Sequence, residues 1–285
     1  MMKAVPFLLF VGAAAFVSSS RLEDARATDA VKVPVITVHA KEFAFTAPAT
    51  IAPGPTSFRL VNDGKELHHL TVMKLEQGKT LKDLEAAMKN PGPPPNWLVS
   101  VGGPNAAAPG GSVEATLNLE AGNYILACFI PSPGSDTPHM MKGMIKPLTV
   151  AGGVSQAGGT FVEEPKAEIH LDVKDYGFVF SKPLTAGKHV IHVMNDGPQE
   201  HEVIFVKLNP GKHIADVVKY VETDKMKGPP PSAIVDGMSG LAKGRTGTFT
   251  ANLTPGTYGL FCMAPDVKDG KSHADHGMTA EFVVK

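Results

Sequence analysis

The chain has 285 residues, a formal net charge of −1 at pH 7, 29 glycines and 24 prolines. A chain of this length can form about two domains, and frequent Gly and Pro favour short strands and turns over long helices. The near-neutral charge provides no basic surface for nucleic acid or for an anionic membrane. We therefore expect a protein built mainly from strands that has no nucleic-acid partner.

The first residues have the organisation of a secretory signal peptide. Lys3 precedes an apolar run at 4–17, and small residues follow at 25–27. A positive residue, a short apolar run and a small-residue cleavage site are typical of export signals, and the run is short for a membrane span. We predict a signal peptide at 1–27, a periplasmic or extracellular mature protein, and no membrane span after cleavage. An uncleaved anchor is the alternative interpretation.

The rest of the chain is one sequence pattern written twice. "KEFAF" at 41–45 matches "KDYGF" at 174–178 at an offset of 133 residues. "LNLEAGNYILACF" at 117–129 matches "ANLTPGTYGLFCM" at 251–263 at an offset of 134. Self-similarity of this kind indicates tandem structural units.

The repeats and their punctuation predict the domain organisation. We place repeat one at 31–150, a flexible Gly-rich linker at 151–166, and repeat two at 167–285. Short apolar runs separated by Gly, Pro, Asn and Asp predict an antiparallel β-sandwich or barrel in each repeat. One amphipathic helix is expected in each repeat, at 79–90 and at 212–223, because apolar residues recur there at helical spacing.

Four residues of the types that bind soft metals occur at matching positions of both repeats. Two imidazoles, one thiolate and one thioether form the ligand set of blue-copper electron-transfer sites. His69 and His276 do not recur, since Glu202 and Lys142 occupy their matching positions. The predicted ligands are His68, Cys128, His139 and Met144 in repeat one, and His201, Cys262, His273 and Met278 in repeat two.

The segments "ELHHLTV", "AGNYILACF" and "PHMMKGM" resemble the cupredoxins, which are Greek-key β-sandwich proteins with a type 1 copper site. The order of an early His, then a Cys, a second His and a Met close together, is similar to the family's order. The resemblance implies two tandem cupredoxin-like β-sandwiches, each with a short helix insertion and one copper. One departure is clear: ten residues separate the Cys from the second His in each repeat, whereas the family has about two to four.

The resemblance and the ligand set predict an exported electron-transfer protein with one mononuclear copper in each repeat and redox proteins as partners. A periplasmic copper carrier or buffer with copper-delivery clients is the second interpretation, since the same ligands hold Cu(I). A metal-free binding module is the third. Because their loops are rich in Pro and Gly, we expect His139 and His273 to lie nearest the surface.

Two further alternatives concern the cysteines. Two cysteines in an exported protein most often form a disulfide, which would join Cys128 to Cys262. A buried Cys on an apolar strand can also be only a core residue. We do not expect an enzyme, because multicopper oxidases and nitrite reductases carry a His beside the copper-bound Cys. The neighbours here are Ala127, Phe129, Phe261 and Met263.

Overall fold

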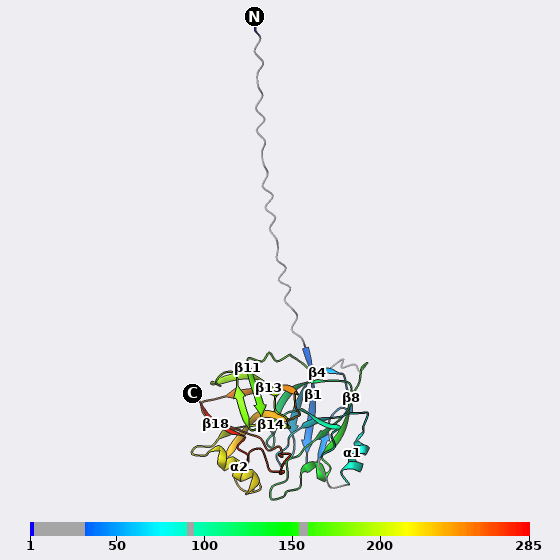
Figure 1. Ribbon diagram of the computed structural model, residues 1–285, viewed down its shortest axis with the longest axis vertical. Helices are drawn as coiled ribbons and strands as arrows, with labels where there is room; N and C mark the ends of the chain where they lie inside the picture. The colour runs from blue at the N-terminus through cyan, green and yellow to red at the C-terminus, as the bar shows by residue number, and fades with distance from the viewer. Residues whose placement is uncertain (3–31, 90–93, 154–158) are drawn as a thin grey trace. The chain divides into compact units, whose positions relative to one another are not determined.

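The computed structural model describes residues 1–2, 32–89, 94–153 and 159–285. The predicted signal peptide, apart from Met1 and Met2, lies outside the described residues. Residues 31–285 form one compact unit, and Figure 1 shows the strands of both repeats inside it, with α1 (Leu81–Ala87) and α2 (Ile214–Glu222) at its periphery. Within the described ranges, none of the helices combines the length and the apolar character that crossing a membrane requires.

Strands from both repeats form the first sheet. Its members are β1 (Lys32–Lys41), β2 (Ala44–Thr46), β4 (Gly54–Asn62), β7 (Ser112–Leu119), β10 (Phe161–Glu163), β11 (Ile169–Lys174), β12 (Gly177–Phe180), β13 (Gly187–Asn195) and β16 (Thr246–Leu253). The order is β10-β1-β4-β7-β16-β13-β11-β12, with β2 paired to β1. The repeats meet where β7 pairs antiparallel with β16, so the sheet is continuous across them.

The second sheet is also continuous across the repeats. Its members are β3 (Thr50–Ile51), β5 (Thr71–Leu75), β6 (Leu98–Gly102), β8 (Gly122–Ala127), β9 (Ile145–Val150), β14 (His201–Leu208), β15 (Ser232–Leu241), β17 (Gly256–Phe261) and β18 (Thr279–Val284). The order is β18-β17-β14-β15-β6-β5-β8-β9-β3. Here the repeats meet where β6 pairs with β15.

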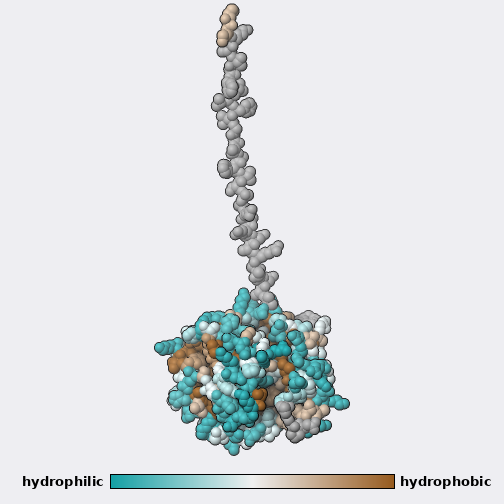
Figure 2. Space-filling view, in the orientation of Figure 1, coloured by the Kyte–Doolittle hydropathy of each residue, from teal (hydrophilic) through white to brown (hydrophobic). Residues whose placement is uncertain are grey.

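Alternating burial along the strands explains how these sheets form a core. In β7, every second side chain from Val113 to Leu119 is buried, as expected for a strand with one face against the interior. The largest cluster of buried apolar residues draws on strands of both repeats, and the face in Figure 2 is mostly hydrophilic with small separated apolar areas. The all-β prediction is confirmed. The Greek-key sandwich within each repeat stays a prediction.

Both predicted helices are present and begin at recognisable caps. Thr80 caps α1, where its side chain accepts from the Asp83 N–H and the Asp83 carboxylate accepts from the Thr80 N–H. The predicted helix at 79–90 is shorter in the structure, since it ends at Ala87 with Leu84 as its buried residue. In α2 the buried residue is Val217.

Two matching glycines allow a close backbone approach where the repeats meet. A Cβ atom on Gly103 would lie 2.0 Å from the Leu70 carbonyl oxygen, and one on Gly237 would lie 2.0 Å from the Val203 carbonyl oxygen. Both backbones also have positive φ, +148° and +152°. A residue with a side chain would therefore strain the backbone at either position.

We expect Gly103→Ala to lower the free energy of unfolding by about 3 kcal/mol, because the new methyl overlaps a backbone oxygen and the positive φ is strained. The control is Gly110→Ala, which has φ +73° but nothing within 4 Å of its new Cβ. That variant bears only the conformational cost, about 1 kcal/mol. Urea unfolding of the three proteins measures the difference. Equal losses in the two variants would show that Gly103 makes no close approach.

Candidate metal centres

Each cysteine lies directly after a buried central strand. Cys128 follows β8 and Cys262 follows β17, and both are fully buried and free. The Cys128–Cys262 disulfide alternative is therefore wrong. Burial raises the pKa of the Cys128 thiol to about 12, and it raises the pKa of the Cys262 thiol as well. Each thiol thus keeps its proton until a metal cation displaces it.

The ten-residue loop after Cys128 returns its histidine to the strand end. The His139 N–H donates to the Ile130 carbonyl at 2.9 Å, and the Met140 N–H donates to the Cys128 carbonyl at 2.8 Å. Pro131 and Pro138 form a β-bridge inside the loop. These bonds join the two ends of the loop, so His139 lies close to Cys128 although ten residues separate them in sequence.

Repeat two closes its loop with the same bonds. The His273 N–H donates to the Ala264 carbonyl at 2.9 Å, and the Ala274 N–H donates to the Cys262 carbonyl at 2.8 Å. The bridge inside this loop joins Pro265 to Ser272. The unusual spacing between Cys and His therefore leaves the second imidazole beside the sulfur in both repeats.

The first histidine of repeat one is held by the segment before β7. His68 and Ala107 exchange two backbone hydrogen bonds, with N···O distances of 3.3 and 2.7 Å. The Asn62 amide donates to the carbonyls of Glu66 and Ala107, at 2.8 and 2.7 Å, and so ties the turn to that segment. In repeat two the Asn195 amide donates in the same way to the carbonyls of Gln199 and of Leu241, the strand partner of His201. The asparagine of the segment "NDG", which recurs at 62–64 and 195–197, thus helps to position the first imidazole of each repeat.

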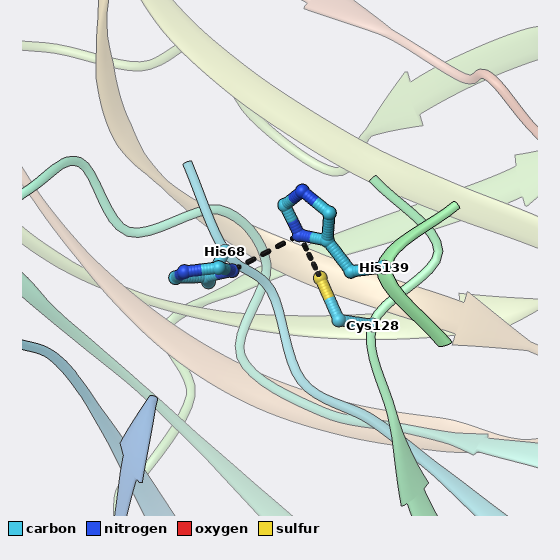
Figure 3. A group of neighbouring side chains, drawn as sticks. All are labelled: His68, Cys128 and His139. Atoms are coloured by element: carbon cyan, nitrogen blue, oxygen red, sulfur yellow. Dashed lines mark hydrogen bonds between the residues drawn. The ribbon is translucent and has the colours of Figure 1, made fainter. Parts of the chain in front are cut away.

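The three donor atoms of each repeat converge in the fully buried interior. Figure 3 shows the His139 ring with its Nδ1 facing both the Cys128 sulfur and His68. The two Nδ1 atoms of His68 and His139 lie 3.1 Å apart, and the sulfur lies 3.6 Å from His139 Nδ1. In repeat two the corresponding separations, for His201, His273 and Cys262, are 3.0 and 3.5 Å.

These separations fit one metal ion in each group. A three-coordinate metal with bonds of about 2.0 Å to nitrogen and 2.3 Å to sulfur separates its nitrogens by about 3.5 Å and nitrogen from sulfur by about 3.7 Å. Burial lowers the pKa of His68, His139, His201 and His273, so all four imidazoles are neutral and have a lone pair to donate. A thiolate with two neutral imidazoles is a donor set that suits copper.

The predicted methionine ligands lie in the same interior. Met144 is fully buried, and its carbonyl accepts from the Cys128 N–H at 3.3 Å, while its own N–H donates to the His139 carbonyl at 3.0 Å. Met278 makes the matching bonds to Cys262 and His273. All four predicted positions of each repeat are therefore neighbours.

Carboxylates that face the Nε2 atoms of two imidazoles favour the tautomer in which Nδ1 is free to bind a metal. Glu66 accepts from His139 Nε2 at 2.9 Å, and Asp175 accepts from His201 Nε2 at 2.7 Å. A proton held at Nε2 leaves the Nδ1 lone pair free and aimed at the sulfur side. The other imidazole of each group lies farther from its carboxylate, 3.6 Å for His68 to Glu42 and 3.8 Å for His273 to Asp266.

Sequence reasoning missed these carboxylates, although the repeat contained a signal for two of them. Glu42 and Asp175 occupy the same place in the matched segments "KEFAF" and "KDYGF". Glu66 lies two residues before His68, and its counterpart in repeat two is Gln199, which is not a carboxylate. The Gln199 amide instead donates to Asp175 at 2.9 Å.

His69 and Glu202 have the same structural role although they differ in chemistry. His69 Nε2 accepts from the Phe129 N–H at 2.7 Å, and the Glu202 carboxylate accepts from the Met263 N–H at 3.0 Å. Each acceptor thus satisfies the backbone donor directly after a cysteine. Burial lowers the pKa of His69 to about 3 and raises the pKa of Glu202 to about 7.

The loop histidines are not exposed to solvent. His139 and His273 are both fully buried, as is the first histidine of each repeat, so the expectation that they lie nearest the surface stays a prediction. Aromatic rings cover them: Phe43 lies 4.9 Å from the His139 ring centroid, and Tyr176 lies 5.4 Å from that of His273. His276, which has no match in repeat one, stacks on Tyr176 at 5.2 Å.

A third group of metal-binding residue types lies beside the second centre. Asp266, Asp269 and His276 have donor atoms within 4.8 Å of one another, and the last two are exposed. Hydrogen bonds already occupy these atoms: His276 Nε2 faces Asp269 at 3.2 Å, and Asp266 accepts from Tyr176 and Gln199. The group is therefore explained as part of the loop's own bonding.

The comparisons with known proteins find likeness in structure alone. No family model and no curated protein sequence match the chain. Reduced auracyanin from Roseiflexus castenholzii matches with 22% identity over 41% of this chain and 97% of its own, at a TM-score of 0.30. Copper nitrite reductase from Nitrosomonas europaea matches with 15% identity over 88% of this chain and 93% of its own, at 0.25. A multicopper oxidase matches with 12% identity over 88% of each chain, at 0.24.

The matches and the ligand groups bear on two sequence-based predictions. Auracyanin A, which also matches with 20% identity, is described as a "blue" copper protein, the class of protein that the sequence resemblance named. The prediction that the protein is not an enzyme is wrong as it was argued, because each cysteine lies in a His–Cys–His group that could hold a metal ion although neither has a His beside it in sequence. The absence of a His beside each cysteine does not exclude an enzymatic role.

We expect acid to destabilise the metal-free protein partly through His69. Its pKa is about 3 in the folded protein against an ordinary value of 6.5, so the unfolded chain binds the proton more tightly. The stability that the neutral imidazole contributes is present above pH 6.5 and is lost as the pH falls toward 3. His69→Gln keeps an acceptor for the Phe129 N–H but does not titrate. Urea unfolding at a series of pH values should give a shallower acid slope for this variant, and an unchanged slope would contradict the assignment.

Proposed function

We propose that this protein is an exported copper protein that transfers single electrons, with one type 1-like mononuclear copper site in each repeat. The observation that carries the proposal is the paired set of donors. In each repeat two Nδ1 atoms lie 3.1 or 3.0 Å apart, and the one on the loop histidine lies 3.6 or 3.5 Å from a buried sulfur. We also propose that 31–150 and 167–285 are two tandem cupredoxin-like Greek-key domains.

The residues of each set have distinct roles in this proposal. His68, Cys128 and His139 would hold copper in repeat one, with Met144 as a weak axial ligand. In repeat two His201, Cys262, His273 and Met278 would do the same. When bound, copper supplies a one-electron couple between Cu(I) and Cu(II).

The chain's own contribution to electron transfer is a site that changes little between oxidation states. Strand ends hold both cysteines, and backbone hydrogen bonds hold all four imidazoles, so the donors are already placed without a metal. Donors that are already placed need little rearrangement when the charge of the metal changes, and a small rearrangement lowers the barrier to electron transfer. Burial keeps water away from the donors and limits ligand exchange.

The surfaces near the two centres support different redox partners. Phe129 and Met141, which lie between the ligands Cys128 and Met144 in sequence, are 36% and 58% exposed and offer an apolar docking area. At the matching positions of repeat two, Asp275 is exposed and Met263 is only partly buried against the core. We propose that an apolar partner surface docks at repeat one and a more polar one at repeat two.

We expect the protein to retain two coppers, and Cys128→Ser and Cys262→Ser to retain one each, because a serine hydroxyl does not replace a thiolate as a soft ligand. Elemental analysis gives the copper count. An intense visible band near 600 nm, from thiolate-to-Cu(II) charge transfer, should fall by about half in each single variant. His39→Gln, which changes an exposed histidine outside both groups, is the control and should retain both coppers.

Other outcomes of the same experiment would replace the proposal. A colourless protein that holds only Cu(I) and gives no reversible redox wave would establish copper handling instead of electron transfer. A protein that retains no copper at either centre would establish a metal-free binding module. Unchanged copper in both cysteine variants would contradict the assigned ligands.

The axial role of Met144 gives a separate expectation. Met144→Gln should lower the reduction potential of the first centre, because an amide oxygen is a harder ligand and favours Cu(II). Met144→Leu should raise it, because the weak sulfur donor is lost. Spectroelectrochemistry in a Cys262→Ser background isolates that centre. Equal potentials in the two variants would show that Met144 is only a core residue.

A further inference from the structure

A short segment between β6 and β7 reaches from the first metal centre to the second. At one end, Ala107 exchanges backbone hydrogen bonds with His68, at 2.7 and 3.3 Å. Two residues earlier, Asn105 is almost fully buried and its side chain contacts repeat two. The segment belongs to repeat one by sequence, but its hydrogen bonds reach a ligand of the first centre at one end and repeat two at the other.

Asn105 makes a specific set of contacts in repeat two. Its side-chain NH₂ lies 3.1 Å from the carbonyl oxygens of Val203 and Met238 and 3.3 Å from a carboxylate oxygen of Glu202. Its side-chain oxygen accepts from the Ala106 N–H at 2.8 Å. Both ends of the carboxamide are thus occupied, which fixes its orientation.

Glu202 connects this contact to the cysteine of repeat two. One carboxylate oxygen faces Asn105, and the other accepts from the Met263 N–H at 3.0 Å. The Glu202 backbone N–H donates to the Cys262 sulfur at 3.4 Å. Glu202 also follows His201 directly in the chain. A shift of this side chain would therefore be felt at a metal-binding sulfur and at a metal-binding imidazole.

In the part of the chain that the structure describes, no side chain of repeat two makes the matching contact with His69 in the first centre. Ser239 stands at the position that matches Asn105, at the offset of 134 residues, and its hydroxyl donates to the Leu70 carbonyl at 2.9 Å. This bond matches that of Asn105 to Val203. Among the residues that the structure describes, it is the only hydrogen bond of the Ser239 side chain. The serine is too short to extend toward His69 as the asparagine extends toward Glu202.

We propose that Asn105 is a positioning residue of the second metal centre, supplied by the first repeat. It holds one oxygen of Glu202, and so directs the other oxygen to the N–H after Cys262 and keeps the Glu202 N–H on the sulfur. The second centre is therefore incomplete without repeat one. Repeat two contacts the first centre differently, through the Lys225 carbonyl, which accepts from the Gly134 N–H of the loop at 2.7 Å. This inference rests on the proposed copper sites, but the contact itself is present in the metal-free protein.

The test uses Asn105→Ser, which introduces the residue type that Ser239 provides at the matching position of repeat two. The serine hydroxyl can still donate to the Val203 carbonyl, as Ser239 does to Leu70, so this bond between the repeats is kept. The contacts of the asparagine NH₂ with Glu202 and with the Met238 carbonyl are lost. In a Cys128→Ser background, chelator competition with Cu(I) reports the second centre alone. We expect its copper affinity to fall about tenfold, the usual effect of losing a group that orients metal ligands.

The matched control places Asn105→Ser in a Cys262→Ser background, where copper binds only to the first centre. Its affinity should not change. A fall of the same size at both centres would show a general loosening of the protein and would overturn the proposal. Urea unfolding confirms that each variant is folded.

A second variant asks whether Asn105 acts through Glu202. Glu202→His reproduces repeat one, where His69 accepts from the backbone N–H after the cysteine, and it removes the carboxylate that Asn105 contacts. Asn105→Ser should then have no further effect on the copper affinity of the second centre. A full tenfold loss in this background would overturn the proposal, because contacting residues that act in series are not additive.

Hydrogen exchange of the metal-free protein separates this inference from the proposed function. Asn105→Ser should speed exchange of the Met263 amide and leave that of Phe129, its match in repeat one, unchanged. If the protein binds no copper but exchange changes as expected, only the proposed function fails. If copper binds at both centres, and neither the exchange nor the affinity of the second centre responds, the role of Asn105 is refuted.

Discussion

The hydrogen bonds that close the loop after each cysteine are the constraint on which both candidate centres depend. They join each loop histidine to the residue two positions after the cysteine, His139 to Ile130 and His273 to Ala264. Without them, ten residues of loop would let the second imidazole sample many positions. With them, the imidazole, the sulfur and the first histidine share one buried space. Loop length in sequence is therefore a poor measure of distance at these sites.

Continuity of the sheets changes the meaning of the duplication. Two separate domains would be expected to move relative to one another through a flexible linker. Here β7 pairs with β16 and β6 with β15, and the main apolar core draws on both repeats. The linker contributes as well, since β10 pairs with β1. Each centre therefore sits in a shared scaffold, and its neighbours include residues from the other half of the chain.

The two centres are alike in their ligands and different in what surrounds them. A neutral histidine satisfies the backbone donor after Cys128, whereas a buried carboxyl group does so after Cys262. The close carboxylate lies on the second imidazole of repeat one but on the first imidazole of repeat two. Because hydrogen bonds and charges near the ligands tune a metal's potential, such differences give two copies of one site different properties.

The sequence by itself determined the duplication, the all-β character, the two helices and the residues that meet at each centre. These features come from local periodicity and from matching positions, which need no knowledge of the fold. Only the tertiary structure decided that the long loops close, that Glu66 and Asp175 orient imidazoles, that the loop histidines are buried, and that Asn105 reaches Glu202. The physical reason is that each of these depends on backbone and side-chain contacts between segments far apart in the chain. Residue spacing carries no record of such contacts.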